Sequence, residues 1–156
     1  MQVLFVCSGN TCRSPLAEAA LRAALGPDAA RVQVSSAGIA AADGLPASIA
    51  SVSVAARDGV DLSSHRSSRA TAERVRTADL VLAMEQVHLD AVRALGADPS
   101  RSHLLSNWPA PGEPGLSIED PFGGSIEAYE ECWRRIQRHL TRVAPHIIET
   151  LRSRSR

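Results

Sequence analysis

Short apolar segments alternate with amphipathic segments along the 156 residues of the chain. The first apolar segment, at 3–6, has no polar position, which is typical of a strand buried on both faces of a parallel sheet. The alternation predicts a single three-layer α/β domain, with helices on both faces of a parallel sheet. In such sheets ligands bind beyond the carboxyl ends of the strands, so we expect chemistry in the loop after the first strand. Strands are expected at 3–6, 32–34, 79–84 and, more weakly, 103–105, and helices at 16–24, 47–57, 71–76 and 85–95.

The C-terminal part of the chain is predicted to be one long amphipathic helix. Pro145 is expected to kink or end it, because proline lacks the N–H that the helix needs and clashes with the preceding turn. We therefore expect a domain at 1–151 and a Ser/Arg tail at 152–156 that frays into solvent. The apolar residues that recur every three or four positions are Ile126, Tyr129, Trp133, Ile136, Leu140, Val143 and Ile147.

Charge and composition exclude several classes of function. Seventeen basic residues, all arginine, balance seventeen acidic ones, so no net charge attracts nucleic acid or an anionic membrane. Five aromatic residues are too few to stack on single-stranded nucleic acid. No apolar run approaches the about 20 residues that span a membrane, and the N-terminus lacks the pattern of a secretory signal. Three cysteines fit reduced thiols rather than a disulfide framework, so we expect a cytoplasmic protein, and a monomer.

The segment at 7–15 carries the strongest functional signal. Gly9 and Asn10 tolerate left-handed backbone angles, so successive N–H groups can turn inward and form a nest for an anion. Ser14 followed by Pro15 is a typical helix start, and the helix directs its positive end and free N–H groups toward the same point. The predicted phosphate-binding residues are Ser8, Gly9, Asn10, Thr11, Cys12, Arg13 and Ser14.

Cys7 and Arg13 give this loop its chemistry. The guanidinium of Arg13 can bind two oxyanion oxygens at once, and together with the helix dipole it favours the thiolate form of Cys7. A lone cysteine at a strand end is more often a small core residue. Here strand, nest, arginine and helix start coincide, which predicts a cysteine nucleophile below a bound phosphoryl group. No Gly-Lys-Ser/Thr follows, so nucleotide hydrolysis by a Walker loop has no support.

These residues resemble the phosphate loop of the low-molecular-weight protein tyrosine phosphatases, and the similarity extends along nearly the whole chain. The resemblance implies a flavodoxin-like fold with a four-stranded parallel sheet, no metal or other cofactor, and a covalent phosphocysteine intermediate. It implies that Cys7 is the nucleophile, that Arg13 binds the phosphate, and that Asp120 is general acid and then general base. The other matching segments are Ser36-Ala37-Gly38, Gly44 with Pro46, 62–67, 78–81 and Asp120-Pro121-Phe122.

The resemblance also assigns residues that support the loop. Ser14 would hydrogen-bond the leaving thiolate. Ser36 and His65 would hold Asn10 in its strained conformation. With Asn10 and Ser14 counted, these four are the loop-supporting residues that we expect.

Asp120 is also an acid candidate on its own chemistry. A leaving group expelled from phosphorus needs a proton, and a positioned carboxylic acid can supply one before its carboxylate activates water. Asp120 follows a Pro/Gly-rich stretch at 106–115, and irregular loops of this length are usually functional or disordered. An isolated Asp-Pro is more often an ordinary turn, but beside the Cys7 loop the catalytic reading is favoured. Asp43, Asp79 and Glu119 are expected to have surface or capping roles.

The remaining cysteines and histidines receive smaller predictions. Cys12 either captures an oxidised Cys7 as a reversible disulfide or simply packs beneath the loop. Cys132 is expected in the core of the last helix. The histidines at 88, 103, 139 and 146 lack ligand spacing, so we expect surface or packing roles and no metal site.

Three classes of function remain open. The leading one is a protein phosphatase that acts on phosphorylated proteins and releases inorganic phosphate. Related arsenate reductases need further cysteines after the third strand, and 79–95 contains none. A binding module without turnover would be expected to lack the nucleophile or the acid. Within the phosphatases, two features resemble the protein-arginine branch: Thr11, where tyrosine enzymes carry a bulky aliphatic residue, and the segment 120–126, which includes Phe122. We therefore expect phosphoarginine as the substrate, with phosphotyrosine as the alternative.

Overall fold

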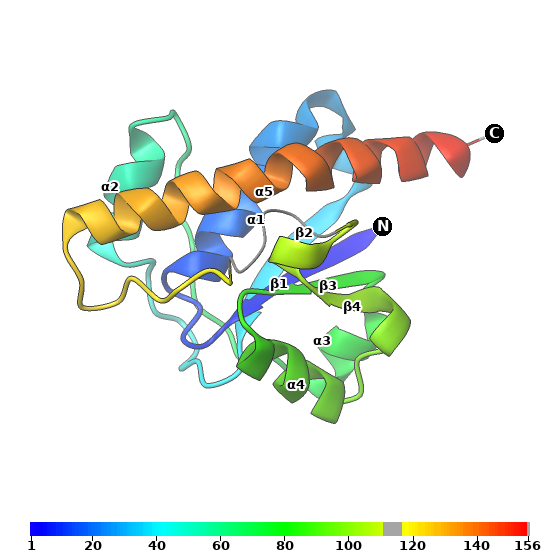
Figure 1. The fold of residues 1–156 in the computed structure, drawn as a ribbon, viewed down its shortest axis with the longest axis horizontal. Helices are drawn as coiled ribbons and strands as arrows, with labels where there is room; N and C mark the ends of the chain where they lie inside the picture. Colours follow the sequence, from blue (N-terminus) through cyan, green and yellow to red (C-terminus); the bar gives the residue numbers. More distant parts are fainter. Residues whose placement is uncertain (111–116, 156) are drawn as a thin grey trace.

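The computed structural model describes residues 1–110 and 117–155. Its centre is a sheet of four strands in the order β2-β1-β3-β4, and every neighbouring pair is parallel (Figure 1). This confirms the predicted parallel four-stranded sheet, and the strand bounds differ from the expected ones by one residue at every end except the C-terminal end of β2, which lies four residues further on. The strands are β1 (Gln2–Cys7), β2 (Gln33–Gly38), β3 (Leu80–Ala83) and β4 (Ser102–Leu104).

Helices cover both faces of the sheet. One hydrophobic core joins the sheet to α1 (Arg13–Leu25), α2 (Ile49–Ala56) and α5 (Ile126–Ser153), and a second joins it to α3 (Ala72–Thr77) and α4 (Gln86–Ala94). Side chains of β1 alternate between the two cores, as expected for a strand with no solvent face: Val3, Phe5 and Cys7 enter the first, and Leu4 and Val6 the second. Short 3-10 helices lie at Gly26–Arg31, Pro99–Arg101 and Leu105–Asn107.

The strand order reverses at β1, which pairs with β2 on one side and with β3 on the other. The carboxyl ends of β1 and β3 therefore lie side by side, and the amide of Met84 after β3 donates to the carbonyl of Val6 at 3.1 Å. This is the position at which a doubly wound sheet opens a crevice for ligands. The loop at 7–15 lies there, as predicted.

The beginning of α1 differs from the prediction. The helix starts at Arg13, and Cys12 occupies the N-cap position without a side-chain cap, so Ser14 does not cap the helix. Pro15 is the third helical residue, which is tolerated because N–H groups of the first turn have no partner within the helix. The hydroxyl of Ser14 is thereby available for the site.

The second difference concerns Pro145. Helix α5 does not end there but runs through it to Ser153. Its buried face, which includes Val143, Ile147 and Leu151, packs on the first core on both sides of the proline, and this burial outweighs one lost hydrogen bond. The start of the tail predicted to fray, at 152–153, is thus helical, and the boundary at 151 stays a prediction. No helix in the described ranges is long and apolar enough to cross a membrane.

Candidate active site

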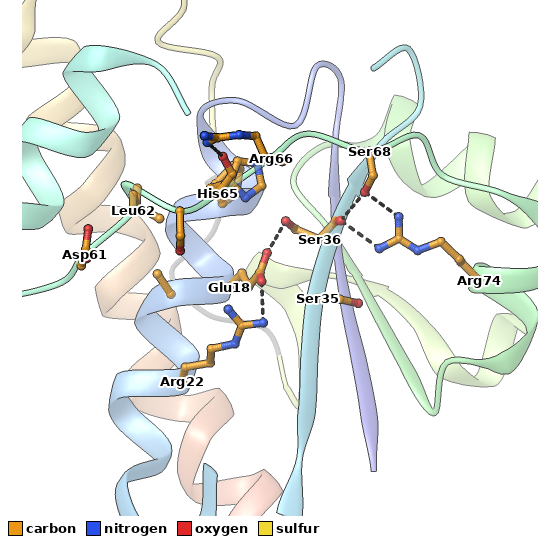
Figure 2. Close-up of a pocket in the computed structure, with 13 residues that line it drawn as sticks. Glu18, Arg22, Ser35, Ser36, Asp61, Leu62, His65, Arg66, Ser68 and Arg74 are labelled. Carbon is orange, nitrogen blue, oxygen red and sulfur yellow. Dashed lines mark hydrogen bonds and ion pairs between the residues drawn. The ribbon is translucent and has the colours of Figure 1, made fainter. Parts of the chain in front are cut away.

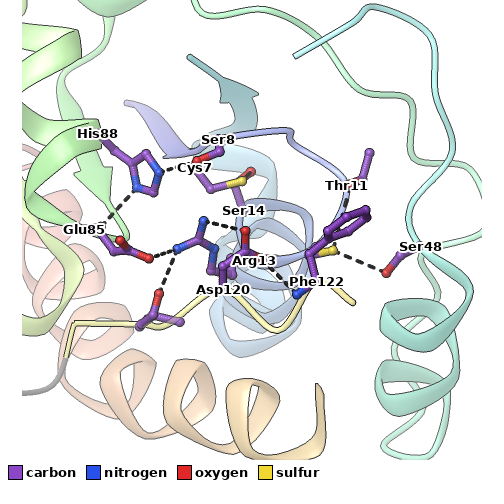
Figure 3. A network of polar contacts seen from close by, with 12 residues as sticks. Cys7, Ser8, Thr11, Arg13, Ser14, Ser48, Glu85, His88, Asp120 and Phe122 are labelled. Atoms are coloured by element: carbon purple, nitrogen blue, oxygen red, sulfur yellow. Dashed lines mark hydrogen bonds and ion pairs between the residues drawn. The ribbon is translucent and has the colours of Figure 1, made fainter. Parts of the chain in front are cut away.

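Cys7 ends β1 with its side chain buried below the loop at 7–14, which we call the phosphate loop. The Ser14 hydroxyl lies 2.9 Å from the Cys7 sulfur (Figure 3). A hydroxyl at this distance can donate to a thiolate and stabilise it. The first turn of α1 thus contacts the sulfur directly, which is the position that the resemblance implied for Ser14.

Asn10 shapes the loop. It is the one described non-glycine residue with positive φ, at 56°, and its side chain is fully buried. Its amide donates to the hydroxyls of Ser14 at 2.8 Å and Ser36 at 2.9 Å, and its carbonyl accepts from His65 Nε2 at 2.7 Å. The Ser68 amide completes the set with a 2.9 Å bond to Asn10 Oδ1. Several bonds therefore hold a backbone conformation that costs free energy.

The glycine that the loop requires is not the expected one. Of the two residues that tolerate a left-handed backbone, Asn10 adopts that conformation and Gly9 does not. Gly38, at the end of β2, is the constrained position: a Cβ there would lie 2.4 Å from the Ser8 carbonyl oxygen and 3.0 Å from the Asn10 nitrogen. The neighbouring strand comes close enough to support the loop only because residue 38 has no side chain.

A polar pocket of about 290 Å³ lies behind the loop (Figure 2). Its wall includes Ser36, whose hydroxyl donates to Glu18 and whose carbonyl accepts from Arg74 at 3.0 Å. Glu18 in turn pairs with Arg22 at 2.7 Å. This charged network fixes the side chain that holds Asn10, and neither Glu18 nor Arg74 was expected from the sequence.

Arg13 is buried and held from several directions (Figure 3). Its Nη1 donates to Glu85, immediately after β3, and to the carbonyl of Ile118 at 2.9 Å. Its Nη2 lies 3.5 Å from Asp120 Oδ2. Its Nε is buried and has no partner among the described residues. The guanidinium is therefore fixed at one end while a buried N–H stays available for an anion, as a phosphate clamp requires.

Asp120 and Phe122 form the outer wall of the pocket. The Asp120 side chain is 46% exposed, and its Oδ1 accepts from the amide of Phe122 at 3.1 Å. Phe122 is 75% exposed. The structure therefore brings the predicted acid to the predicted nucleophile and clamp, around a cavity of about 210 Å³. Its lining residues are Cys7, Gly9, Asn10, Thr11, Cys12, Arg13, Asp120 and Phe122.

Two of the loop residues that line this cavity, Thr11 and Cys12, also make contacts outside it. The Cys12 sulfur is buried and lies 3.5 Å from the Ser48 hydroxyl and 3.7 Å from the hydroxyl of Tyr129. Burial, together with the hydrogen bond between its hydroxyl and the Cys12 sulfur, raises the pKa of Tyr129. The Thr11 carbonyl accepts from the Ser48 amide at 2.8 Å, which ties the loop to the start of α2.

His88 contacts the phosphate loop, a role that the sequence analysis did not predict for it. It is fully buried, and its Nε2 lies 2.8 Å from the hydroxyl of Ser8 in the phosphate loop. His88 lies on α4 and Glu85 follows β3, and both contact residues of the loop that follows β1. The signal available in the sequence was position: both residues follow a strand that was predicted to end at the ligand-binding edge of the sheet.

The other titratable candidates have structural roles. Asp79 accepts from the Gln2 amide at 2.7 Å and Asp43 from the Arg69 amide at 2.9 Å; both bonds are exposed, which agrees with the surface or capping roles predicted for them. Cys132 is buried in the core as predicted, and burial raises its pKa to about 12, so it stays a thiol. Within 1–110 and 117–155 no three His, Cys, Asp or Glu side chains are grouped so that they could hold a metal ion.

A loop that begins at a buried cysteine and ends at a buried arginine, with a carboxylate on the same cavity, is the arrangement expected of a cysteine-dependent phosphatase. The family model for low molecular weight phosphotyrosine protein phosphatase matches residues 2–154, and the chain belongs to this family. The resemblance read from the loop is thereby confirmed.

Relatives in the family include both protein-tyrosine and protein-arginine phosphatases. The chain is 37% identical over 146 residues to a probable low molecular weight protein-tyrosine-phosphatase EpsP of Ralstonia solanacearum, covering 93% of this chain and 94% of that protein. It is 36% identical over 143 residues to the protein-arginine-phosphatase of Geobacillus stearothermophilus, covering 92% and 93%. Among solved structures, a mutant of YwlE arginine phosphatase with a phosphorylated active-site serine matches with a TM-score of 0.84 at 32% identity, covering 94% and 95%.

Proposed function

We propose that this protein is a protein phosphatase that works through a phosphocysteine intermediate and acts on phosphoarginine in proteins. The observation that carries the proposal is the convergence of Cys7, Arg13 and Asp120 on one cavity of about 210 Å³. Each has the chemistry for one step: a nucleophile, an anion clamp and a proton donor.

The reaction follows from these contacts. The Cys7 sulfur attacks phosphorus while the loop amides and the Arg13 guanidinium bind the equatorial oxygens. Asp120, at the open side of the cavity, gives its proton to the departing atom. The Asp120 carboxylate then takes a proton from water, whose oxygen attacks phosphorus and breaks the S–P bond. Cys7 leaves as a thiolate stabilised by the Ser14 hydroxyl at 2.9 Å, and inorganic phosphate is released.

Thr11 supports phosphoarginine as the substrate. It lines the cavity together with Phe122 and lies near it (Figure 3), at the end where we expect the body of the substrate to leave the phosphate loop. A planar guanidinium carries N–H groups that are costly to bury unpaired, and a threonine hydroxyl is a possible partner that an aliphatic residue lacks. Total identity does not separate the substrates, since tyrosine and arginine phosphatases match at 37% and 36%.

Phosphotyrosine is the second candidate, favoured by one observation. Phe122 is 75% exposed at the cavity, and an aromatic side chain there can pack on a phenyl ring. Arsenate reduction by a cysteine relay has less support, because it needs a reactive thiol outside the loop. The cysteine outside the loop, Cys132, is buried in the core, which raises its pKa to about 12.

The deciding experiment measures kcat/KM of one enzyme preparation on peptides of the same sequence that carry phosphoarginine or phosphotyrosine. We expect phosphoarginine to be preferred, and the Cys7→Ser variant serves as the inactive control. Preference for phosphotyrosine would assign the enzyme to the other branch. Thiol oxidation that depends on arsenate would favour the reductase, and tight binding of either peptide without turnover would favour a binding module.

We further propose a cytoplasmic, monomeric enzyme that needs no metal or other cofactor. Cys12 is proposed as the thiol that captures an oxidised Cys7. Reduced and peroxide-treated protein can be compared before and after thiol reductant. Cys12→Ser should recover much less activity than the parent, and equal recovery would leave Cys12 a packing residue.

A further inference from the structure

His88 joins two parts of the site that are far apart in sequence. The backbone N–H of Glu85 donates to His88 Nδ1 at 3.1 Å, so Nδ1 is an acceptor and carries no proton. The proton of the neutral ring is then on Nε2, which donates to the Ser8 hydroxyl oxygen at 2.8 Å (Figure 3). One imidazole thus accepts from the beginning of α4 and donates to the residue that follows Cys7.

The surroundings favour this neutral form. Burial lowers the pKa of His88 to about 4, and the positive charge of Arg13 acts in the same direction. The negative charges of Glu85 and Asp120 act in the opposite direction with smaller effect. A protonated ring would also turn its Nδ1–H against the Glu85 N–H, which removes the acceptor that this amide needs.

We propose that His88 is a positioning residue of the phosphate site. Its neutral ring fixes the Ser8 side of the phosphate loop and the backbone of Glu85, the residue whose side chain holds Arg13. The inference rests on the proposed function, since it assigns the loop to phosphate. Ser8 itself is not among the residues that line the cavity, so His88 acts through the loop and not on the substrate. The loss of this anchor should weaken phosphate binding more than it slows chemistry once substrate is bound.

Three substitutions separate the two bonds of the ring. His88→Gln places an amide N–H near the position of Nε2 and keeps the donor to Ser8. His88→Asn places an oxygen near the position of Nδ1 and keeps the acceptor for the Glu85 amide. His88→Leu removes both. His103→Gln is the matched control, because His103 lies on β4 and bonds the carbonyl of Ser100.

The binding constant of inorganic phosphate is measured by calorimetry for each variant, along with kcat and KM on an aryl phosphate and the melting temperature. We expect His88→Leu and His88→Asn to weaken phosphate binding by about 10-fold, the scale of one hydrogen bond near a charged group, with KM changing more than kcat. His88→Gln should recover most of this loss, and His103→Gln should match the parent.

A double-mutant cycle with Ser8→Ala tests the contact itself. If His88 acts through Ser8, then His88→Asn should weaken phosphate binding by less than about twofold once Ser8 is alanine. Losses that multiply, equal weakening in Gln and Asn variants, or a lower melting temperature with unchanged phosphate binding would each overturn the inference. A parent that binds phosphate but hydrolyses no phosphorylated compound would contradict the proposed function alone, because the calorimetric comparison does not depend on turnover.

Discussion

The two walls of the cavity are built differently. The phosphate loop is buried and held by many side chains: Asn10 alone takes part in four hydrogen bonds, and Arg13 is fixed by Glu85 and Ile118. The opposite wall is exposed. The Asp120 carboxylate is 46% exposed and contacts only Arg13, at 3.5 Å, and the amide of Phe122 among the described residues.

This difference separates two tasks. The loop is preorganised, so it can bind a phosphoryl group and stabilise charge without rearrangement at the moment of reaction. Asp120 lies at the exposed wall, where leaving groups of different shapes must fit. The bound substrate itself supplies the rest of its surroundings. Changes in the loop should therefore affect every substrate, whereas changes in the outer wall should depend on what is leaving.

The largest effect is expected for Cys7→Ser. A serine hydroxyl is almost wholly protonated at neutral pH, so repeated turnover should fall to background while phosphate binding and the fold are kept. Mass spectrometry after incubation with substrate checks whether the serine retains a phosphoryl group, as in the YwlE structure with a phosphorylated active-site serine. Substantial steady-state activity in this variant would rule out the phosphocysteine mechanism.

Asp120→Asn tests the outer wall. The amide keeps the shape of the carboxyl but has no proton to give, so kcat should fall by about 10²–10⁴ on a poor leaving group. The loss should shrink on leaving groups that depart without a proton, and the binding of inorganic phosphate should change little. Aryl phosphates with a series of leaving-group pKa values measure this. An equal loss across the series would assign Asp120 another role and break the contrast between the two walls.

The residues of the loop predicted the parts of the site that lie close together in the chain, and the distant Asp120, Ser36 and His65 were predicted with the help of the family resemblance. Cys7, Arg13 and Ser14 lie within one loop, so their spacing alone describes their geometry. Glu85 was missed because it is 72 residues from Arg13, and His88 because it is 80 residues from Ser8. Only the parallel pairing of β1 with β3 brings them together, and residue spacing does not contain that information.

The errors in the fold have a common physical cause. Ser14-Pro15 was interpreted by local preference as a helix start with Ser14 as the cap, and Pro145 as a kink or an end of the helix, of which the end is wrong. In the structure the Ser14 hydroxyl bonds Cys7 and Asn10 instead, and α5 continues through Pro145 to pack on the core. Tertiary contacts outweigh local preferences of about 1–3 kcal/mol, and they do so here beside the active site and in the longest helix.

Thr11→Ile tests where the two walls meet. Isoleucine adds apolar surface that can cover a phenyl ring but removes the hydroxyl that can face a guanidinium. We expect kcat/KM to fall for phosphoarginine and rise for phosphotyrosine, and the ratio to shift by about 10–200-fold, the range of a methyl-scale change in a pocket. Peptides of matched sequence give the ratio. If both activities fall together, Thr11 only packs against Ser48, and the assignment to phosphoarginine loses its residue-level support.

The last expected effect is on the pH dependence of the protein's stability, and it comes from His88 beside the phosphate loop. The pKa of His88 is lowered from 6.5 to about 4, first by burial and then by Arg13. Well above pH 6.5 neither the folded nor the unfolded chain protonates this ring, and well below pH 4 both do. Between these values the unfolded chain takes up a proton that the folded chain does not, so the free energy of unfolding must fall as the pH falls.

His88→Gln isolates this contribution, because glutamine does not titrate and keeps the donor to Ser8. Asp61, Asp98 and Glu131, whose pKa values are lowered by hydrogen bonds, also reduce stability in acid, but they do so equally in both proteins and cancel in the difference. We expect the melting temperature of the parent to drop more steeply than that of His88→Gln between pH 6.5 and pH 4. Parallel curves would mean that water or a shifted side chain accommodates the charged ring, so the loop wall would be less rigid than its hydrogen bonds indicate.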